Sequence, residues 1–421
     1  MTPETTALII FALTYLLFIS EMVNKTVAAL LGAMLMVVYG IIDYDIVGTV
    51  IDYKTLTVAV GMMIIVNVVK KSGLFEYIAI KAAKMTKGDP FRLMIIIVIL
   101  SVFISTFFSN ITATIVLGTL IVSLCRRLDL EFVPYLFVIS LSVNVGGILT
   151  PVSSLPNIMI STAAGFSFTD FFRNILVLGI LLIFSTIVYF KFIFRKQFNK
   201  EITEEEKAKL LNFDETREIK DKKLFTRSII ILILILVFFL IQDFTGIGNE
   251  AIAITGAIVM LLLSSADPEE IFSQVQWSTI AFFVGLFIVI GGVEHVGLLE
   301  TAAHIITRFI SGKNSAIFTI LGTSTIASSI VDNIPVTAIL IPILKNMQGL
   351  MDLSNSLFFP LVVGAGLGGN LTPIGSPSNV IAMGIAKKNN RKIKFMDFVK
   401  VGFGLTIIQL VISGVYFYLF L

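Results

Sequence analysis

The amino-acid sequence predicts an all-α protein that crosses a membrane many times, and three observations support this fold class. Apolar residues make up 56% of the 421 residues, and charged residues only 14%. The mean hydropathy is +0.97, which is more than the interior of a soluble domain can absorb. Apolar runs close to the roughly 20 residues that a bilayer requires recur along the whole chain. We therefore expect a polytopic helical membrane protein.

The composition also excludes several classes of protein. A formal net charge of +3 is too small to indicate a nucleic-acid partner. One cysteine, Cys125, excludes a disulfide framework and a thiolate metal cluster, and two histidines argue against a metal held by imidazoles. Walker A, H-E-x-x-H and G-x-S-x-G patterns are absent. We expect no enzyme activity and no cofactor, and an ion gradient rather than a partner ATPase as the source of energy.

Eight apolar runs are predicted to cross the membrane as simple helices. The first of them lacks the basic n-region and the cleavage site of a signal peptide, so we expect it to be retained. The runs are Thr5 to Ser20, Val27 to Ile42, Thr55 to Val69, Asn174 to Phe194, Ser228 to Gln242, Ala251 to Ser264, Thr279 to Val293 and Phe403 to Leu421.

The two halves of the chain repeat each other. The polar motif Ser109-Asn110-Ile111 recurs as Asp332-Asn333-Ile334, and Gly146-Gly147-Ile148-Leu149-Thr150-Pro151 recurs as Gly368-Gly369-Asn370-Leu371-Thr372-Pro373. These motifs and the spans around them are related by offsets of 222 to 224 residues. We predict a first repeat over residues 1–198, a mixed-charge linker over 195–226 and a second repeat over 227–421.

The positive charges predict the orientation. Acidic residues Asp43, Asp45 and Asp52 fill the loop before the third span, and a basic cluster follows that span. The positive-inside rule then places both termini outside and the linker in the cytoplasm, in the plasma membrane. Each repeat has five crossings, so the second is inverted relative to the first, as in many secondary transporters. The basic cluster consists of Lys70, Lys71, Lys81, Lys84, Lys87 and Arg92.

Four further segments carry polar residues inside apolar runs. Residues 91–125 have basic residues at both ends, which favours a hairpin that re-enters from one side with Ser109-Asn110-Ile111-Thr112 at its tip. By the repeat, residues 315–344 form a second hairpin with Asp332-Asn333-Ile334-Pro335 at its tip. Residues 132–164 and 357–386 are then crossing helices that are interrupted at the two glycine motifs.

Such interruptions indicate a binding site. Irregular backbone at membrane depth is tolerated only where it faces protein or a water-filled cavity, since each unpaired backbone group costs several kcal/mol there. Asp332 is the only carboxylate expected deep in the bilayer, and a carboxylate there can exchange a proton for a cation. The alternatives are that the small polar residues only permit close helix packing, and that Asp332 is permanently paired or caps a hairpin arm.

These motifs resemble those of the ion transporter superfamily, which includes arsenite permeases, citrate-type carriers, sodium/dicarboxylate symporters, sodium/proton antiporters and the P protein. The Ser-Asn and Asp-Asn-Ile-Pro tips look closest to the arsenite permease and P-protein branch. The resemblance implies an elevator mechanism, a possible homodimer, and sodium sites at Ser105, Ser109 and Asn110 and at Ser328, Asp332 and Asn333. The full set of candidate ion- and substrate-binding residues is Ser105, Ser109, Asn110, Thr112, Gly147, Thr150, Ser153, Asn157, Ser328, Asp332, Asn333, Thr337, Asn370, Thr372, Gly375, Ser376 and Asn379.

The expected function is ion-coupled secondary transport within the lipid bilayer. The leading expectation is proton- or sodium-coupled efflux of a small inorganic anion or its neutral acid, such as arsenite or antimonite, with Asp332 as the proton-coupling group. A sodium/proton antiporter is the first alternative and a citrate or dicarboxylate carrier the second. An ion channel is the alternative from a different class. The dicarboxylate carriers have Ser-Asn-Thr in both hairpins, so Asp332 departs from that pattern.

Overall fold

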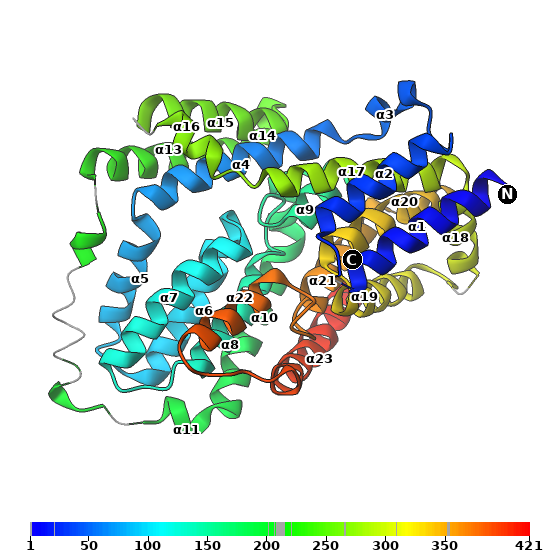
Figure 1. The fold of residues 1–421 in the computed structure, drawn as a ribbon. Coiled ribbons are helices and arrows are strands. Elements are labelled where there is room, and N and C mark those ends of the chain that lie inside the picture. The colour runs from blue at the N-terminus through cyan, green and yellow to red at the C-terminus, as the bar shows by residue number, and fades with distance from the viewer. Residues whose placement is uncertain are drawn as a thin grey trace.

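The computed structural model describes residues 2–20, 22–200, 202–205, 207, 215–219, 221–264, 267–308, 310–351 and 354–421. Every regular element in these ranges is a helix (Figure 1), which confirms the predicted all-α class. Eight of the described helices are long and apolar enough to cross a membrane by length and composition, namely α1, α4, α6, α7, α10, α13, α17 and α23.

The helices of the first half follow the predicted segments closely. Their bounds are α1 Pro3–Ser20, α2 Lys25–Val38, α3 Tyr44–Val50, α4 Tyr53–Lys71, α5 Leu74–Met85, α6 Pro90–Phe107, α7 Asn110–Arg127, α8 Val133–Gly146, α9 Leu155–Ala164, α10 Phe168–Ile193 and α11 Arg195–Phe198.

The second half repeats this order after a short 3-10 turn, η1, at Glu215–Glu218. Its helices are α13 Lys222–Leu240, α14 Gln242–Thr245, α15 Asn249–Ser264, α16 Pro268–Ser273, α17 Trp277–His295, α18 Leu298–Thr307, α19 Lys313–Ile330, α20 Asn333–Met351, η2 Asn355–Leu357, α21 Phe358–Gly368, α22 Pro377–Lys388 and α23 Phe395–Phe420.

Several helices begin earlier than hydropathy indicates, because capping groups start them in the polar zone. The span predicted from Asn174 begins at Phe168, where Ser167 and Asp170 form a capping box. The predicted linker over 195–226 is likewise too long, since α13 begins at Lys222 behind the N-cap Asp221. Residues 201, 206, 208–214 and 220 of that linker lie outside the described residues.

One set of helices, α1, α2, α4, α13, α15 and α17, forms what we term the crossed group. In it α2 packs on α17 and α4 packs on α15, and each contact is made close by one glycine. A Cβ atom on Gly61 would lie 2.7 Å from the backbone of Ala253, and one on Gly285 would lie 2.7 Å from the backbone of Ala29. Gly61 and Gly285 are 224 residues apart, so the two halves contribute equivalent contacts.

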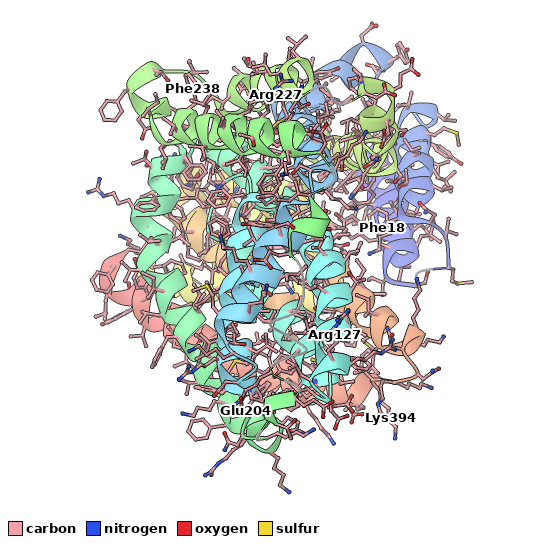
Figure 2. The ribbon with its side chains drawn as sticks, turned by 90° about the vertical axis from the view of Figure 1, so that its left-hand side faces the viewer. Phe18, Arg127, Glu204, Arg227, Phe238 and Lys394 are labelled. Atoms are coloured by element: carbon pink, nitrogen blue, oxygen red, sulfur yellow. The ribbon has the colours of Figure 1, made fainter. Side chains whose placement is uncertain are left out.

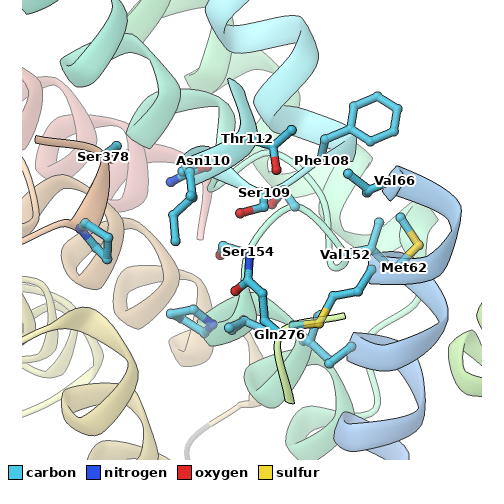
Figure 3. Close-up of a pocket in the computed structure, with 18 of the residues that line it drawn as sticks. Met62, Val66, Phe108, Ser109, Asn110, Thr112, Val152, Ser154, Gln276 and Ser378 are labelled. Atoms are coloured by element: carbon cyan, nitrogen blue, oxygen red, sulfur yellow. The ribbon is translucent and has the colours of Figure 1, made fainter. Parts of the chain in front are cut away.

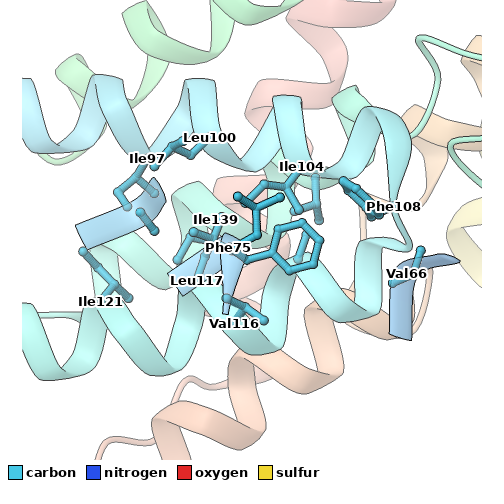
Figure 4. Close-up of a cluster of buried hydrophobic side chains, with 14 of the residues drawn as sticks. Val66, Phe75, Ile97, Leu100, Ile104, Phe108, Val116, Leu117, Ile121 and Ile139 are labelled. Carbon is cyan, nitrogen blue, oxygen red and sulfur yellow. The ribbon is translucent and has the colours of Figure 1, made fainter. Parts of the chain in front are cut away.

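The remaining long helices, α6 to α10 and α19 to α23, form what we term the hairpin group. Here α6 packs on α8 and α19 on α21, again through equivalent glycines. A Cβ on Gly146 would lie 2.4 Å from the Val102 carbonyl oxygen, and one on Gly368 would lie 2.5 Å from that of Thr325. Figure 4 shows the apolar contacts of the first hairpin, in which Ile104 of α6 and Val116 of α7 meet Phe75 of α5.

The two halves differ in how the hairpin group meets the crossed group. Helix α9 packs on α4, and α20 packs on α17. Their repeat equivalents, α22 on α17 and α7 on α4, make no comparable contact within the described part of the chain. The hairpin group is therefore displaced from the symmetric position that the repeat alone would give.

In Figure 1, α3 and α18 lie at the right-hand end, near the N-terminus, and α5 and α11 lie at the left.

Charged side chains gather at the left-hand end of the molecule. Figure 2, in which that end faces the viewer, labels Arg127, Glu204 and Lys394 in its lower part, and these come from three separate segments. Ion pairs join such segments: Lys84 Nζ lies 2.6 Å from Glu215 Oε2, and an Arg391 nitrogen lies 3.0 Å from Glu131 Oε2. These ion pairs connect segments that are far apart in the sequence.

Candidate functional site

Four interruptions of the helices meet at one cavity. The chain is extended at Phe108 between α6 and α7 and at Val331 between α19 and α20. It also leaves helical structure between α8 and α9 and between α21 and α22. The cavity of about 120 Å³ lies between these four breaks and α4 (Figure 3). At roughly 10 to 15 Å³ for each water, it has room for several waters or a small polar solute.

The first turns of four helices line this cavity. Asn110 of α7, Leu155 of α9, Asn333 of α20 and Pro377 of α22 all face it, each at the start of its helix. Helix N-termini carry unpaired N–H groups and a partial positive charge, so together they attract an anion. Asp332 is the only ionisable side chain among the described residues that line the cavity. The site thus combines four anion-favouring helix ends with one carboxylate.

The tip of the first hairpin is held by side chains of its own group. Ser105 Oγ donates to Asn110 Oδ1 at 2.7 Å and to the Val143 carbonyl oxygen. Asn110 Nδ2 donates to Asn144 Oδ1 at 3.0 Å. Gly147 lies against this tip, because a Cβ there would be 2.9 Å from Asn110 Nδ2. Oxygen atoms of the kind that sodium prefers are therefore concentrated at this tip.

An amide pair joins the two halves beside residues that line the cavity. Asn144 Nδ2 donates to Asn370 Oδ1 at 2.7 Å, and Ser376 Oγ donates to Asn144 Oδ1 at 3.0 Å. The repeat equivalents of Asn144 and Asn370 are Gly366 and Ile148. These also meet, since a Cβ on Gly366 would lie 2.1 Å from Ile148 Cγ2. One of two symmetry-related contacts is thus polar and the other apolar.

The loops at the two breaks are held by the same hydrogen bonds in both halves. Asn157 Nδ2 donates to the carbonyl oxygens of Gly147 at 3.0 Å and Thr150 at 2.9 Å. In the second half, Asn379 Nδ2 donates to the equivalent oxygens of Gly369 at 2.7 Å and Thr372 at 2.9 Å. These buried amides satisfy carbonyl groups that the broken helices leave open. They hold the shape of the breaks.

Hydroxyl groups fix the same loops to the hairpins. Thr150 Oγ1 donates to the Thr106 carbonyl oxygen, and Thr372 Oγ1 to that of Ser329, both at 2.6 Å. Ser328 Oγ donates to the Ala365 carbonyl oxygen at 2.7 Å. Further bonds run from Ser153 Oγ to the Gly147 carbonyl oxygen at 2.8 Å and from Gly375 N to Thr372 Oγ1 at 3.1 Å.

Asp332, at the tip of the second hairpin, is held from outside the hairpin group. Lys25 Nζ, in the first turn of α2, lies 3.2 Å from Asp332 Oδ2. The other carboxylate oxygen accepts a hydrogen bond from Ile334 N at 3.3 Å. The Asp332 side chain is 9% exposed and that of Lys25 is 33% exposed. Asp332 is therefore both paired and a helix cap in this conformation.

The predicted residues divide into two sets. Those that line the cavity are Ser109, Asn110, Thr112, Ser153, Asp332, Asn333 and Ser376. Those that do not line it are Ser105, Gly147, Thr150, Asn157, Ser328, Thr337, Asn370, Thr372, Gly375 and Asn379.

Some residues at the site were missed by the sequence argument. Asn144 stands where the repeat has Gly366, two residues before the glycine pair that both halves share, and this polar difference is a signal that could have found it. Lys25 gave no signal, since a lysine before an apolar run is ordinary. The other polar residues missed in the lining are Asn67, Ser154, Gln274, Gln276 and Ser378.

Residues 15–355 match the citrate transporter family. The chain belongs to this family. As a member of the citrate transporter family with many apolar helices, it is an integral membrane transporter. The resemblance to the ion transporter superfamily, drawn from the hairpin and break motifs, is confirmed.

Three related proteins are similar to this chain along nearly its whole length. An uncharacterized transporter of Mycobacterium tuberculosis is 33% identical, with 98% of this chain and 97% of that protein covered. The 46 kDa membrane protein of Mycobacterium leprae is 32% identical, with 98% of each covered. The P protein of Sus scrofa is 28% identical over 98% of this chain and 59% of its own length.

The fold is also similar to that of a solved transporter. The crystal structure of YdaH from Alcanivorax borkumensis superposes with a TM-score of 0.64 over 90% of both chains, at 14% sequence identity. At that identity the likeness concerns the fold alone. It supports the arrangement of helices around the cavity.

Proposed function

We propose that the protein is a sodium-coupled secondary transporter of a small carboxylate of the citrate type. The observation that carries this proposal is the meeting of four helix N-termini at one cavity, which favours a bound anion. The match to the citrate transporter family supports a carboxylate as that anion.

Asp332 supports cation coupling. A carboxylate substrate that enters beside Asp332 meets like charge in a partly buried site, which is unfavourable unless a cation is bound as well. The Ser105 and Asn110 side-chain oxygens and the Val143 carbonyl oxygen lie together at the first hairpin tip and are suitable ligands for sodium. The coupling ion thus neutralises the site before the substrate binds.

The arrangement of helices supports an elevator mechanism on an inverted repeat. The hairpin group would slide along the crossed group, because the equivalent glycine contacts keep each group internally rigid. With the termini outside and residues 195–226 in the cytoplasm, the pairs Lys84–Glu215 and Arg391–Glu131 fall on the cytoplasmic side. In this proposed orientation Gln274 and Gln276, which line the cavity from the loop before α17, would also face the cytoplasmic side.

Arsenite export is the second candidate, and one observation favours it. Neither lysine nor arginine is among the described residues that line the cavity, which instead offers amide and hydroxyl groups. Such a site suits an uncharged hydroxylated acid, which is the form of arsenite at neutral pH. A neutral substrate would need no second cation beside Asp332.

The experiment is solute flux in proteoliposomes that contain the purified protein. We expect accumulation of labelled citrate only with an inward sodium gradient, and saturation with citrate concentration. Sodium-driven proton movement without citrate would identify an antiporter, movement with arsenite alone would identify the second candidate, and ohmic current would identify a channel.

The variant Asp332→Asn tests the coupling group. Removal of the carboxylate should abolish the dependence of citrate flux on sodium, with the protein still folded, because the cation loses its charged ligand. Sodium titration of the initial flux and the melting temperature are the two measurements. Unaltered sodium dependence in this variant would remove Asp332 from the mechanism.

A further inference from the structure

Two polar contacts hold the second hairpin tip to the first two helices. The Lys25 ammonium group lies 3.2 Å from Asp332 Oδ2, and the Tyr15 hydroxyl donates to the Pro335 carbonyl oxygen at 3.0 Å. Lys25 and Tyr15 belong to the crossed group, whereas Asp332 and Pro335 belong to the hairpin group. We refer to these four residues as the clasp. It joins the two groups at the edge of the cavity.

The clasp exists in one half of the chain only. At the offset of 224 that relates Gly61 to Gly285, the equivalent of Lys25 is Asn249. At the offset of 223 that relates the two hairpin tips, the equivalent of Asp332 is Ser109. Asn249 donates to the Phe166 carbonyl oxygen at 3.4 Å, away from the first hairpin tip. The ion pair is therefore a feature that the two halves do not share. It lies where the hairpin group meets the crossed group.

The charges make the clasp sensitive to a bound cation. A buried carboxylate that loses its partner is strongly destabilised, because it has lost both water and counter-charge. Lys25 stays with α2, so any sliding of the hairpin group takes Asp332 away from it. Movement is favourable only when another cation takes the place of the ammonium group. Sodium bound at Asp332 meets this requirement.

We propose that Lys25 is the internal counter-cation of Asp332. In the carrier without sodium, the Lys25 ammonium group is paired with the Asp332 carboxylate and holds the second hairpin tip against α1 and α2. Sodium displaces Lys25, opens the clasp and frees the hairpin group to move. Lys25 is thus a coupling residue that acts by competition with sodium. This inference rests on the proposed sodium-coupled transport.

The first test measures sodium-22 binding to the purified protein by scintillation proximity. Lys25→Ala removes the competitor, so the apparent affinity for sodium should rise by about fivefold or more, the lower end of usual coupling between sites. Lys25→Arg retains the charge and should bind sodium as the wild type does. Lys54→Ala, which removes the Lys54–Glu250 pair at 3.6 Å elsewhere in the crossed group, is the matched control.

A merely structural ion pair gives a different result. In that case Lys25→Ala would lower the melting temperature and leave sodium affinity unchanged or weaker, and this outcome overturns the proposal. Citrate flux in the wild type would still depend on sodium, so the proposed function would stand. If the wild type binds no sodium, the proposed function and the role of Lys25 both fail.

The second test keeps Lys25 and Asp332 intact, in case Lys25→Ala does not fold. Tyr15→Cys and Pro335→Cys are introduced together in a Cys125→Ala background, which removes the only native cysteine. A short bifunctional thiol reagent should cross-link the pair efficiently without sodium and at least about fivefold more slowly with saturating sodium. A rate that sodium does not change overturns the proposal.

Discussion

The tips of the two hairpins have the same backbone and different partners. The first tip is held within its own group, where Asn110 bonds to Ser105 and to Asn144. The second is held by the other group, where Lys25 pairs with Asp332. Behind both tips, Asn157 and Asn379 make the same bonds to the breaks. The two halves thus share the framework of the site and differ in the side chains that face it.

This difference between the tips could allow a chain with two similar halves to respond differently to an ion on the two sides of the membrane. Two identical tips would respond to an ion in the same way from either side. Here one tip carries neutral oxygens inside a hydrogen-bond network of its own group, and the other carries a charge whose partner belongs to the other group. We therefore propose that the first tip supplies neutral oxygen ligands and that sodium binding at Asp332 of the second tip controls movement.

The largest expected effect concerns the framework that the halves share. Gly368→Val should lower stability by more than about 3 kcal/mol, because its side chain would overlap the Thr325 backbone and Ser328. Gly146→Val should do the same in the first half. Yield of monodisperse protein and Tm in detergent are the measurements. Gly384→Val is the control, since nothing lies within 4 Å of a Cβ there; a folded Gly368→Val protein of normal Tm would contradict the close packing.

A smaller effect should separate the two tips. Asn110→Ala should lower stability by about 1 to 3 kcal/mol, because it removes two buried hydrogen bonds, one with Ser105 and one with Asn144. Asn333→Ala should cost less than about 1 kcal/mol, as no side-chain hydrogen bond of Asn333 is found within the described residues. Tm measures stability and sodium-22 binding measures affinity, which we expect to weaken in both variants. Equal losses of stability would mean that the tips are not distinct.

Tyr15→Phe tests the neutral half of the clasp. It removes one hydrogen bond to the Pro335 carbonyl oxygen, so we expect a loss of about 0.5 to 1.5 kcal/mol in the sodium-free protein. Sodium should reduce this difference, because the clasp is open in the sodium-bound protein. Tm with and without sodium is the measurement. The same difference under both conditions would show that Tyr15 does not follow the movement.

The smallest effect is expected inside the crossed group. Lys54 and Glu250 form an ion pair at the surface, in the first turns of α4 and α15. Lys54→Ala should change stability by less than about 1 kcal/mol and leave citrate flux unaltered, since surface pairs are screened by water and salt. A large loss of flux would mean that ion pairs within the crossed group also control transport.

Much of the site was predictable, because the breaks are local features of the sequence. Polar and glycine residues inside apolar runs must interrupt helices at membrane depth, which placed Ser109, Asn110, Asp332 and Asn333 near their observed positions. The support roles of Asn157 and Asn379 were not predictable. An asparagine in the first turn after a break can face either the cavity or the loop, and packing decides which.

The sequence by itself determined the helical class, the duplication and the four breaks. Hydropathy and repeat offsets are local properties of the linear sequence, and the bilayer favours a helix for each apolar run, because its backbone groups must be hydrogen-bonded. Tertiary structure alone decided that Lys25 meets Asp332 and that Asn144 meets Asn370, pairs separated by 307 and 226 residues. Such contacts depend on how far the hairpin group is displaced along the crossed group. That displacement is set by side-chain packing across the whole molecule, which no local pattern records.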